Sequence, residues 1–136
     1  MTQPLSDRSY QSLAHFRHAL RVFERFSEDA ARAAGITPAQ HQLLLVIRGH
    51  LGPDAPSVSD VAARLQLKLH SAGELVGRAE ARGLVDRWAD PVDLRRALLT
   101  LTPMGEAKLA ELSVLHRREL RRFRREMNDV LRELDD

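Results

Sequence analysis

Three short helical patterns follow one another between residues 37 and 83, and they limit the fold more than any other feature of the chain. Each carries apolar residues at helical spacing and ends near a glycine or a polar break. The last two are separated by only a few residues around 66–68, and the final one extends from about residue 70 to residue 82. Two short helices joined this closely are typical of a helix-turn-helix.

Capping residues mark the starts of the first two of these helices. Thr37 is the expected N-cap of the first helix, Pro38 suits its first position, and Gln40 completes a capping box. Ser57 is the expected N-cap of the second helix, where Asp60 lies near the positive end of the helix dipole. Both helices are therefore predicted to begin at these points.

Longer helices and a hairpin flank this region. Residues 84–88 and 97–101 have the pattern of two short strands around the charged loop 89–96, which indicates a β-hairpin. Residues 6–34 and 103–134 each carry an apolar stripe at steps of three or four residues. This order predicts a mostly α-helical (α+β) winged helix-turn-helix, with the hairpin as its wing and the long helices for dimerisation.

The apolar stripes of the two long helices are too extensive for helices that stand alone in water. Stripes with this repeat form seams between helices. We therefore expect the two long helices to meet in a homodimer. The residues expected in the dimer seam are Leu13, Phe16, Leu20, Leu120, Phe123, Met127 and Val130.

Composition narrows the class of function. A chain of 136 residues is long enough for one domain with its own core. The absence of cysteine excludes disulfide scaffolds, thiol nucleophiles and cysteine redox sites. No phosphate-binding glycine loop, nucleophile elbow or zinc-protease motif occurs, so we expect neither an enzyme nor a cofactor. The N-terminus lacks a secretory pattern and no apolar run could span a membrane, so we expect a cytoplasmic protein with no membrane partner.

The basic residues are almost all arginine, 19 against 2 lysines, although the net charge is only +2. Arginine suits bidentate phosphate contacts, but so small a net charge does not by itself indicate nucleic-acid binding. Six arginines lie within residues 117–125, and they form either a second nucleic-acid surface or a solvated face. On a solvated face, Arg122 would pair with Glu126 and Arg125 with Asp129.

Four motifs, in the same order along the chain, resemble the MarR (multiple antibiotic resistance regulator) family. Residues 75–85, Leu-Val-Gly-Arg-Ala-Glu-Ala-Arg-Gly-Leu-Val, are similar to the run that ends that family's recognition helix and begins its wing. Residues 93–95, Asp-Leu-Arg, match its Asp-x-Arg wing motif. Residues 99–105, Leu-Thr-Leu-Thr-Pro-Met-Gly, are similar to its Leu-x-Leu-Thr-x-x-Gly run. Residues 37–40, Thr-Pro-Ala-Gln, lie where such proteins open their second helix.

The resemblance implies a sequence-specific DNA-binding transcriptional regulator, a repressor that binds a pseudo-palindromic operator as a homodimer and is released by a small ligand. It implies one MarR-like domain over residues 1–136, with the winged helix-turn-helix at 37–102. The ligand would lie between the dimerisation helices and the winged part. The residues expected to line this pocket are His15, Phe16, Leu20, His41 and Leu44.

The recognition helix and the wing would supply the DNA contacts. The N-terminal residues of such a helix meet base edges in the major groove, and a wing arginine can enter a narrow minor groove. Asp93 would hold the wing loop in shape, while Arg78 and Arg87 would contact phosphates or form internal ion pairs. The residues expected at the DNA are Lys68, His70, Ser71, Glu74, Arg78, Arg87, Asp93, Arg95 and Arg96.

Other interpretations stay open at the sequence level. Gly73 and Glu74 stand where threonine and arginine are common in the family, and Glu74 would otherwise pair with Arg78 at i+4. The rival hypothesis is a winged-helix dimer that has lost operator binding and serves as a protein-interaction module. His15 and His18, one helical turn apart, could share a metal, but we expect histidines at helix interfaces and no metal site.

Overall fold

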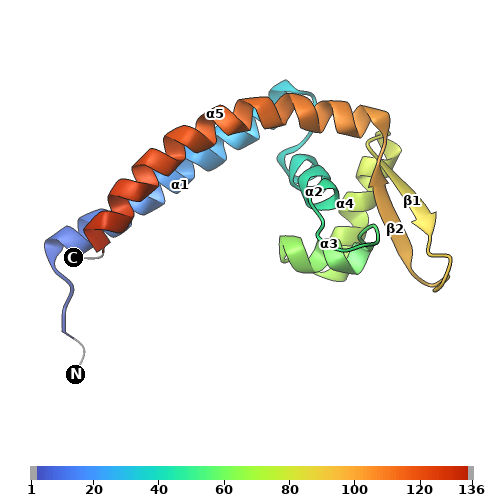
Figure 1. Ribbon diagram of the computed structural model, residues 1–136, viewed down its shortest axis with the longest axis horizontal. Helices are drawn as coiled ribbons and strands as arrows, with labels where there is room; N and C mark the ends of the chain where they lie inside the picture. The colour runs from blue at the N-terminus through green and yellow to red at the C-terminus, as the bar shows by residue number, and fades with distance from the viewer. Residues whose placement is uncertain (1–2, 135–136) are drawn as a thin grey trace.

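The computed structural model describes residues 3–134, and its elements follow the order expected from the sequence (Figure 1). Over those residues it is mostly helical with one two-stranded antiparallel sheet, which confirms the predicted fold class. No helix in this range is long and apolar enough to cross a membrane. The elements are α1 (Asp7–Ala33), α2 (Pro38–Arg48), α3 (Val58–Leu65), α4 (Leu69–Ala81), β1 (Val85–Ala89), β2 (Ala97–Leu101) and α5 (Pro103–Leu134).

The helices α2, α3 and α4 and the hairpin pack together at one end of the molecule and are called here the winged unit (Figure 1). Its interior is apolar and closed to solvent, as expected for a core that drives folding. Among the largest side chains that it buries completely are Leu43, Leu44, Val61, Val76 and Leu99.

The capping box expected at Thr37 is present in the winged unit, and the expected cap Ser57 forms a second box with Asp60. Thr37 Oγ1 accepts a hydrogen bond from the Gln40 N–H at 3.0 Å, and Ser57 Oγ accepts one from the Asp60 N–H at 3.2 Å. The side chains of Gln40 and Asp60 accept in return from the N–H groups of the two caps. These reciprocal bonds satisfy helix-end donors that would otherwise lack partners.

The wing is attached to the helices as well as to itself. The strands Val85–Ala89 and Ala97–Leu101 pair antiparallel over their whole length. On the other side of β2, the Leu99 N–H donates to the Pro56 carbonyl at 2.8 Å. The base of the wing is therefore fixed to the segment that leads into α3. β1 ends at Ala89, one residue later than the sequence pattern predicts.

The two long helices α1 and α5 lie side by side and form a helical arm that extends from the winged unit (Figure 1). The rings of Phe23 and Phe123 are in contact, with centroids 5.2 Å apart, and Ser12 Oγ donates to Glu133 Oε2 at 2.8 Å. Val130 is completely buried within this single chain. It stabilises the helix pair and offers no surface to a second chain, unlike its expected place in a dimer seam.

The arm joins the winged unit at the start of α5. Thr102 Oγ1 donates to the Gly83 carbonyl at 2.5 Å and accepts from the Gly105 N–H at 3.0 Å. A Cβ atom added at Gly105 would collide with the Leu84 carbonyl oxygen. The close approach of two backbones explains the need for glycine at this junction.

Candidate nucleic-acid interface

The outer face of α4 carries the residues that the sequence places in a major groove. Ala72, Val76 and Ala79 face the core, and His70 and Glu74 project from the exposed side. His70 Nε2 lies 3.0 Å from Glu74 Oε1. The ion pair expected between Glu74 and Arg78 is not formed, because Glu74 reaches back one turn instead of forward.

The N-terminus of α4 differs from those of the other helices of the winged unit. Lys68 occupies its N-cap position, and no side chain caps the helix. The first N–H groups of α4 are therefore left for solvent or for an external acceptor. With the exposed Lys68 beside them, they make a position at which a phosphate can bind.

Two glycines flatten the exposed side of α4. A Cβ at Gly73 or Gly77 would meet no atom within 4 Å, and neither residue has a positive φ. Packing inside the chain therefore does not require glycine at either position, although each glycine weakens the helix by about 1 kcal/mol relative to alanine. Their absence of side chains lets another molecule approach the α4 backbone closely.

The tip of the wing is held by two aspartates. Asp90 Oδ1 accepts from the N–H groups of Val92 at 2.9 Å and Asp93 at 3.3 Å. Asp93 Oδ1 accepts from the Arg95 N–H at 3.1 Å, and its carboxylate lies 3.5 Å from Arg95 Nε. The Arg95 side chain is nevertheless 95% exposed. The loop thus presents a guanidinium to solvent from an ordered backbone.

The neighbouring arginine Arg96 turns inward. Its Nη2 lies 3.1 Å from Asp60 Oδ2, so it ties the wing to the start of α3. The Ser57 N–H, helped by the Arg96 guanidinium, holds the pKa of the Asp60 carboxyl below its usual value. The two residues are 36 positions apart, so no local sequence pattern predicts this contact.

The other expected DNA-contacting residues divide into two groups. Arg87 Nε lies 3.5 Å from Glu80 Oε1, so Arg87 has an ion-pair partner inside the winged unit. Lys68, Ser71 and Arg78 are exposed on or beside α4. Within residues 3–134, Arg78 and Lys68 have no acidic partner within 4 Å.

The residues expected to line a ligand pocket do not come together. A groove of about 390 Å³ does lie between α1 and α2, and of the five expected residues only Leu20 is among those that line it. Leu44 is buried in the core of the winged unit, and His15 is exposed on α1. The residues that line the groove are Leu20, Phe23, Glu24, Ser27, Glu28, Pro38, Ala39 and Gln42.

A pair of histidines, His41 buried and His116 half-buried, lies close to this groove. His41 of α2 is only 3% exposed, and its ring centroid is 4.7 Å from that of His116 of α5. His116 Nε2 is 2.8 Å from Ser27 Oγ, while His41 Nδ1 has no hydrogen-bond partner among the described residues. Burial, with a smaller contribution from His116, lowers the pKa of His41 to about 4. The sequence did not predict this contact between the arm and the winged unit.

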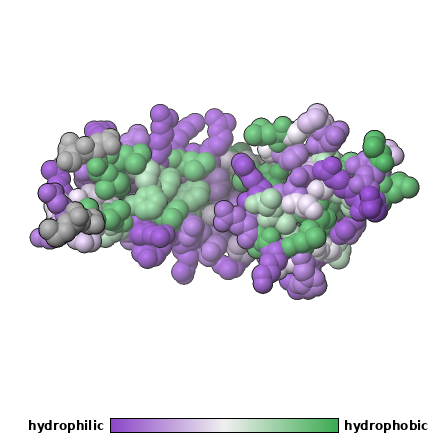
Figure 2. Space-filling view, turned by 90° about the horizontal axis from the view of Figure 1, so that it is seen from below, coloured by the Kyte–Doolittle hydropathy of each residue, from purple (hydrophilic) through white to green (hydrophobic). Residues whose placement is uncertain are grey.

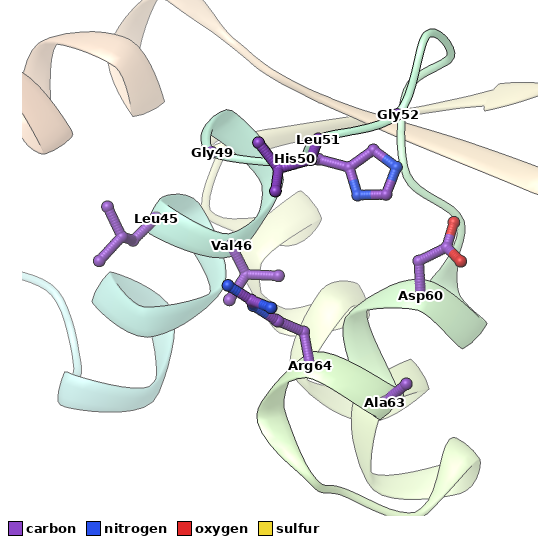
Figure 3. Close-up of a pocket in the computed structure, with 9 residues that line it drawn as sticks. All are labelled: Leu45, Val46, Gly49, His50, Leu51, Gly52, Asp60, Ala63 and Arg64. Atoms are coloured by element: carbon purple, nitrogen blue, oxygen red, sulfur yellow. The ribbon is translucent and has the colours of Figure 1, made fainter.

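A wider groove of about 630 Å³ lies on the winged unit itself, between the end of α2 and α3 (Figure 3). Leu45 and Val46 border it on the α2 side, and Arg64 borders it on the α3 side. The His50 ring points toward Asp60 at one edge. None of the residues expected in the ligand pocket lines this groove. Residues 3–134 hold no group of three or more metal-ligating side chains.

The capped helix α3, the uncapped helix α4 and the hairpin attached to them define a winged helix-turn-helix protein. Residues 34–96 match the model of the MarR family. This match covers 63 of the 136 residues, and we assign the chain a likeness to the MarR family in these residues and in its fold.

Individual relatives agree with this assignment. A protein of Thauera aromatica, whose name assigns it to transcriptional regulation of the hcr operon, is 28% identical over 85% of this chain and 68% of its own length. The MarR family transcription regulator SP03579 is 25% identical, with a TM-score of 0.74 over 86% of this chain and 76% of its own. A cysteine-to-serine mutant of MarR from E. coli, complexed with operator DNA, is 23% identical, with a TM-score of 0.62 over 71% of this chain and 66% of its own.

Proposed function

We propose that the protein is a DNA-binding transcriptional regulator that binds a pseudo-palindromic operator as a homodimer in the cytoplasm. The observation that carries the proposal is Arg95, whose backbone N–H is held by Asp93 while its side chain is 95% exposed. An arginine presented on an ordered loop suits a narrow minor groove, where negative potential is concentrated. A mutant of E. coli MarR, which shares this fold, forms a complex with operator DNA, and this supports DNA as the partner.

In this proposal α4 lies in the major groove. Lys68 and the open N–H groups of the first turn contact a phosphate, and Arg78 contacts another. His70, Ser71 and Glu74 lie at base edges, where a carboxylate can accept from a cytosine amine. Arg87 and Arg96 act on DNA binding indirectly, because their partners are Glu80 and Asp60.

The proposed homodimer forms through the arm. Figure 2 shows apolar residues gathered over the arm on the face seen from below, with hydrophilic residues along both edges. Leu13 and Leu120 are exposed in the single chain, at 42% and 46%. Phe16, Leu20, Phe123 and Met127 are half-buried and complete the seam that we propose. An apolar face of this kind is covered in most proteins by a partner.

We further propose that the regulator is a repressor released by a small ligand. The groove between α1 and α2 is the proposed site, because it lies between the arm and the winged unit. A ligand there would favour one placement of the two winged units over another. It can shift the equilibrium only by the difference between its affinities for the two placements.

The wing is tested by Arg95→Ala. Selection of duplexes from a random pool, at two salt concentrations, should enrich an inverted repeat with half-sites about 10 bp apart. Arg95→Ala should then weaken binding to that site by about 1–3 kcal/mol. Arg25→Ala is a matched control, because Arg25 is also an exposed arginine beside an aspartate but lies on the arm. Unchanged affinity in Arg95→Ala would remove the wing from the mechanism.

A protein-interaction module is the second candidate function, favoured by the His70–Glu74 pair and by Leu69, which is 60% exposed on α4. The dependence of binding on salt concentration distinguishes the two candidate functions. Binding through several phosphates weakens steeply as salt rises, whereas apolar association does not. A folded dimer that enriches no duplex at low salt would favour the protein partner.

A further inference from the structure

The solvent face of α5 carries six arginines within residues 117–125. All six are exposed: Arg117, Arg118, Arg121, Arg122, Arg124 and Arg125. At about 100° of rotation per residue, the six fall within an arc of about 160° on one side of the helix. No other residue of the segment 117–125 lies in that arc, so the surface, called here the arginine face, is purely cationic.

Three glutamates of the same helix are turned away from the arginine face, while the exposed Asp129 lies one turn beyond its C-terminal end. Glu119, Glu126 and Glu133 are half-buried, and Glu133 accepts a hydrogen bond from Ser12 of α1. They therefore lie toward the side of α5 that packs on α1. The C-terminal part of the chain is nearly neutral in sum, but within residues 117–125 the acidic Glu119 lies on a different side of the helix from the six arginines.

Ion pairs do not neutralise the arginine face. Among residues 3–134, Arg122 is the one member with an acidic partner within 4 Å, and its Nε is 3.9 Å from Glu126 Oε1. The expected pair between Arg125 and Asp129 is not formed, because Asp129 lies 3.9 Å from Arg132 instead. Five guanidinium groups are thus available to an external acceptor along about 12 Å of helix.

We propose that the arginine face binds the phosphate backbone of a second DNA duplex. Guanidinium groups donate to phosphate oxygens in bidentate pairs, and lysine is absent from this face. A membrane-binding helix would need apolar residues beside its cations, and this arc has none between 117 and 125. A repeating row of like charges complements a repeating row of phosphates and needs no particular base sequence.

The arginine face is separate from α4 and the wing, which form the proposed operator-binding surface. In Figure 1, α1 runs along the lower side of α5, and the winged unit hangs below the other end of α5 with the wing tip pointing away from it. The arc opposite α1 therefore faces away from the winged unit. The protein would hold one duplex with its winged units and a second duplex on the opposite side.

The first test measures how affinity for a random-sequence duplex depends on salt. The full-length variant Arg118→Gln/Arg121→Gln/Arg125→Gln removes three charges from the centre of the arginine face. The control Arg25→Gln/Arg32→Gln/Arg132→Gln removes three charges from the same arm, where each arginine has an acidic partner. In an Arg95→Ala background, only the arginine-face variant should weaken binding, by about tenfold or more at low salt, and lower the salt slope by about three units. Equal losses in both triple variants, or none in either, would overturn the proposal.

The second test asks whether one protein holds two duplexes. A biotinylated duplex on beads is saturated with protein, and capture of a fluorescent second duplex is measured. Wild-type protein should capture it, and the arginine-face variant should lose most of that capture while it stays on the first duplex. Undiminished capture by the variant would assign bridging to the two winged units and overturn the proposal. The proposal would also be overturned if the arginine-face variant kept its affinity for DNA but lost binding to phosphatidylserine vesicles. That result would assign the arginine face to a membrane. The Arg95→Ala variant changes the wing and keeps the arginine face intact. The experiments therefore test DNA binding by the wing and DNA binding by the arginine face independently.

Discussion

The winged unit and the arm differ in how completely each covers its own apolar surface. The winged unit closes its core within one chain, with Leu43, Leu44 and Leu99 fully buried. The arm buries Leu112 completely near the winged unit, but farther along, its described part buries completely only small or medium side chains, while leucines such as Leu120 and Leu131 stay exposed. The winged unit therefore covers its own apolar surface within one chain, whereas the arm leaves apolar surface exposed for the second chain that we propose.

The largest expected effect comes from a charge placed on the arm. Leu120→Asp should raise the dissociation constant of the proposed homodimer by at least about 100-fold, because a carboxylate would be buried without a partner in each of two chains. Sedimentation equilibrium measures this directly. Leu51→Asp is the matched control, since Leu51 is 93% exposed on the winged unit and should leave association unchanged. A Leu120→Asp protein that stays dimeric would place the interface elsewhere.

A smaller effect is expected at the junction between the two regions. Gly105→Ala should lower the free energy of unfolding by about 1–3 kcal/mol, because the added methyl group forces α5 away from the Leu84 carbonyl. Gly77→Ala should instead raise it by up to about 1 kcal/mol, since its Cβ meets open space. Urea unfolding monitored by circular dichroism measures both. Similar free energies of unfolding for the two variants would mean that the start of α5 can move away from Leu84 without a loss of stability.

A comparable or smaller effect is expected from acid, through the histidine that joins the regions. The pKa of His41 is lowered to about 4 in the folded chain, so the unfolded chain binds the proton more tightly. The free energy of unfolding should therefore be unaffected above about pH 7 and fall by about 2 kcal/mol between pH 7.5 and pH 5. His41→Phe should flatten this dependence in urea unfolding at each pH. An equally steep dependence in His41→Phe would assign the acid sensitivity to other groups.

The fold was predictable because its decisive signals are local. The caps Thr37 and Ser57 bond to residues three positions away, and the strands of the wing are separated by one short loop. Helical periodicity places such elements without knowledge of their neighbours. The order of these elements then leaves few ways to pack them.

The candidate site was predictable only where a contact is equally local. Asp93 does hold Arg95, two positions away. The partner of Arg96 is 36 residues distant, and the ring contact between His41 and His116 joins two separate helices. Glu74 had two possible partners at the same spacing, and the sequence offered no reason to choose His70 over Arg78. When a side chain has two possible partners at the same spacing, the three-dimensional structure decides which one it contacts. The periodicity of the sequence carries no information about that.

One continuous helix connects the base of the wing to the far end of the arm. With 32 residues, α5 is about 48 Å long. The contact between Gly105 and Leu84 holds the N-terminal end of this helix. If α5 tilts by about 5° around that contact, its C-terminal end moves by about 4 Å, which is more than the rise of about 3.4 Å between successive base pairs. Two winged units joined through their arms would therefore lose register on DNA after a rotation far too small to disturb either core.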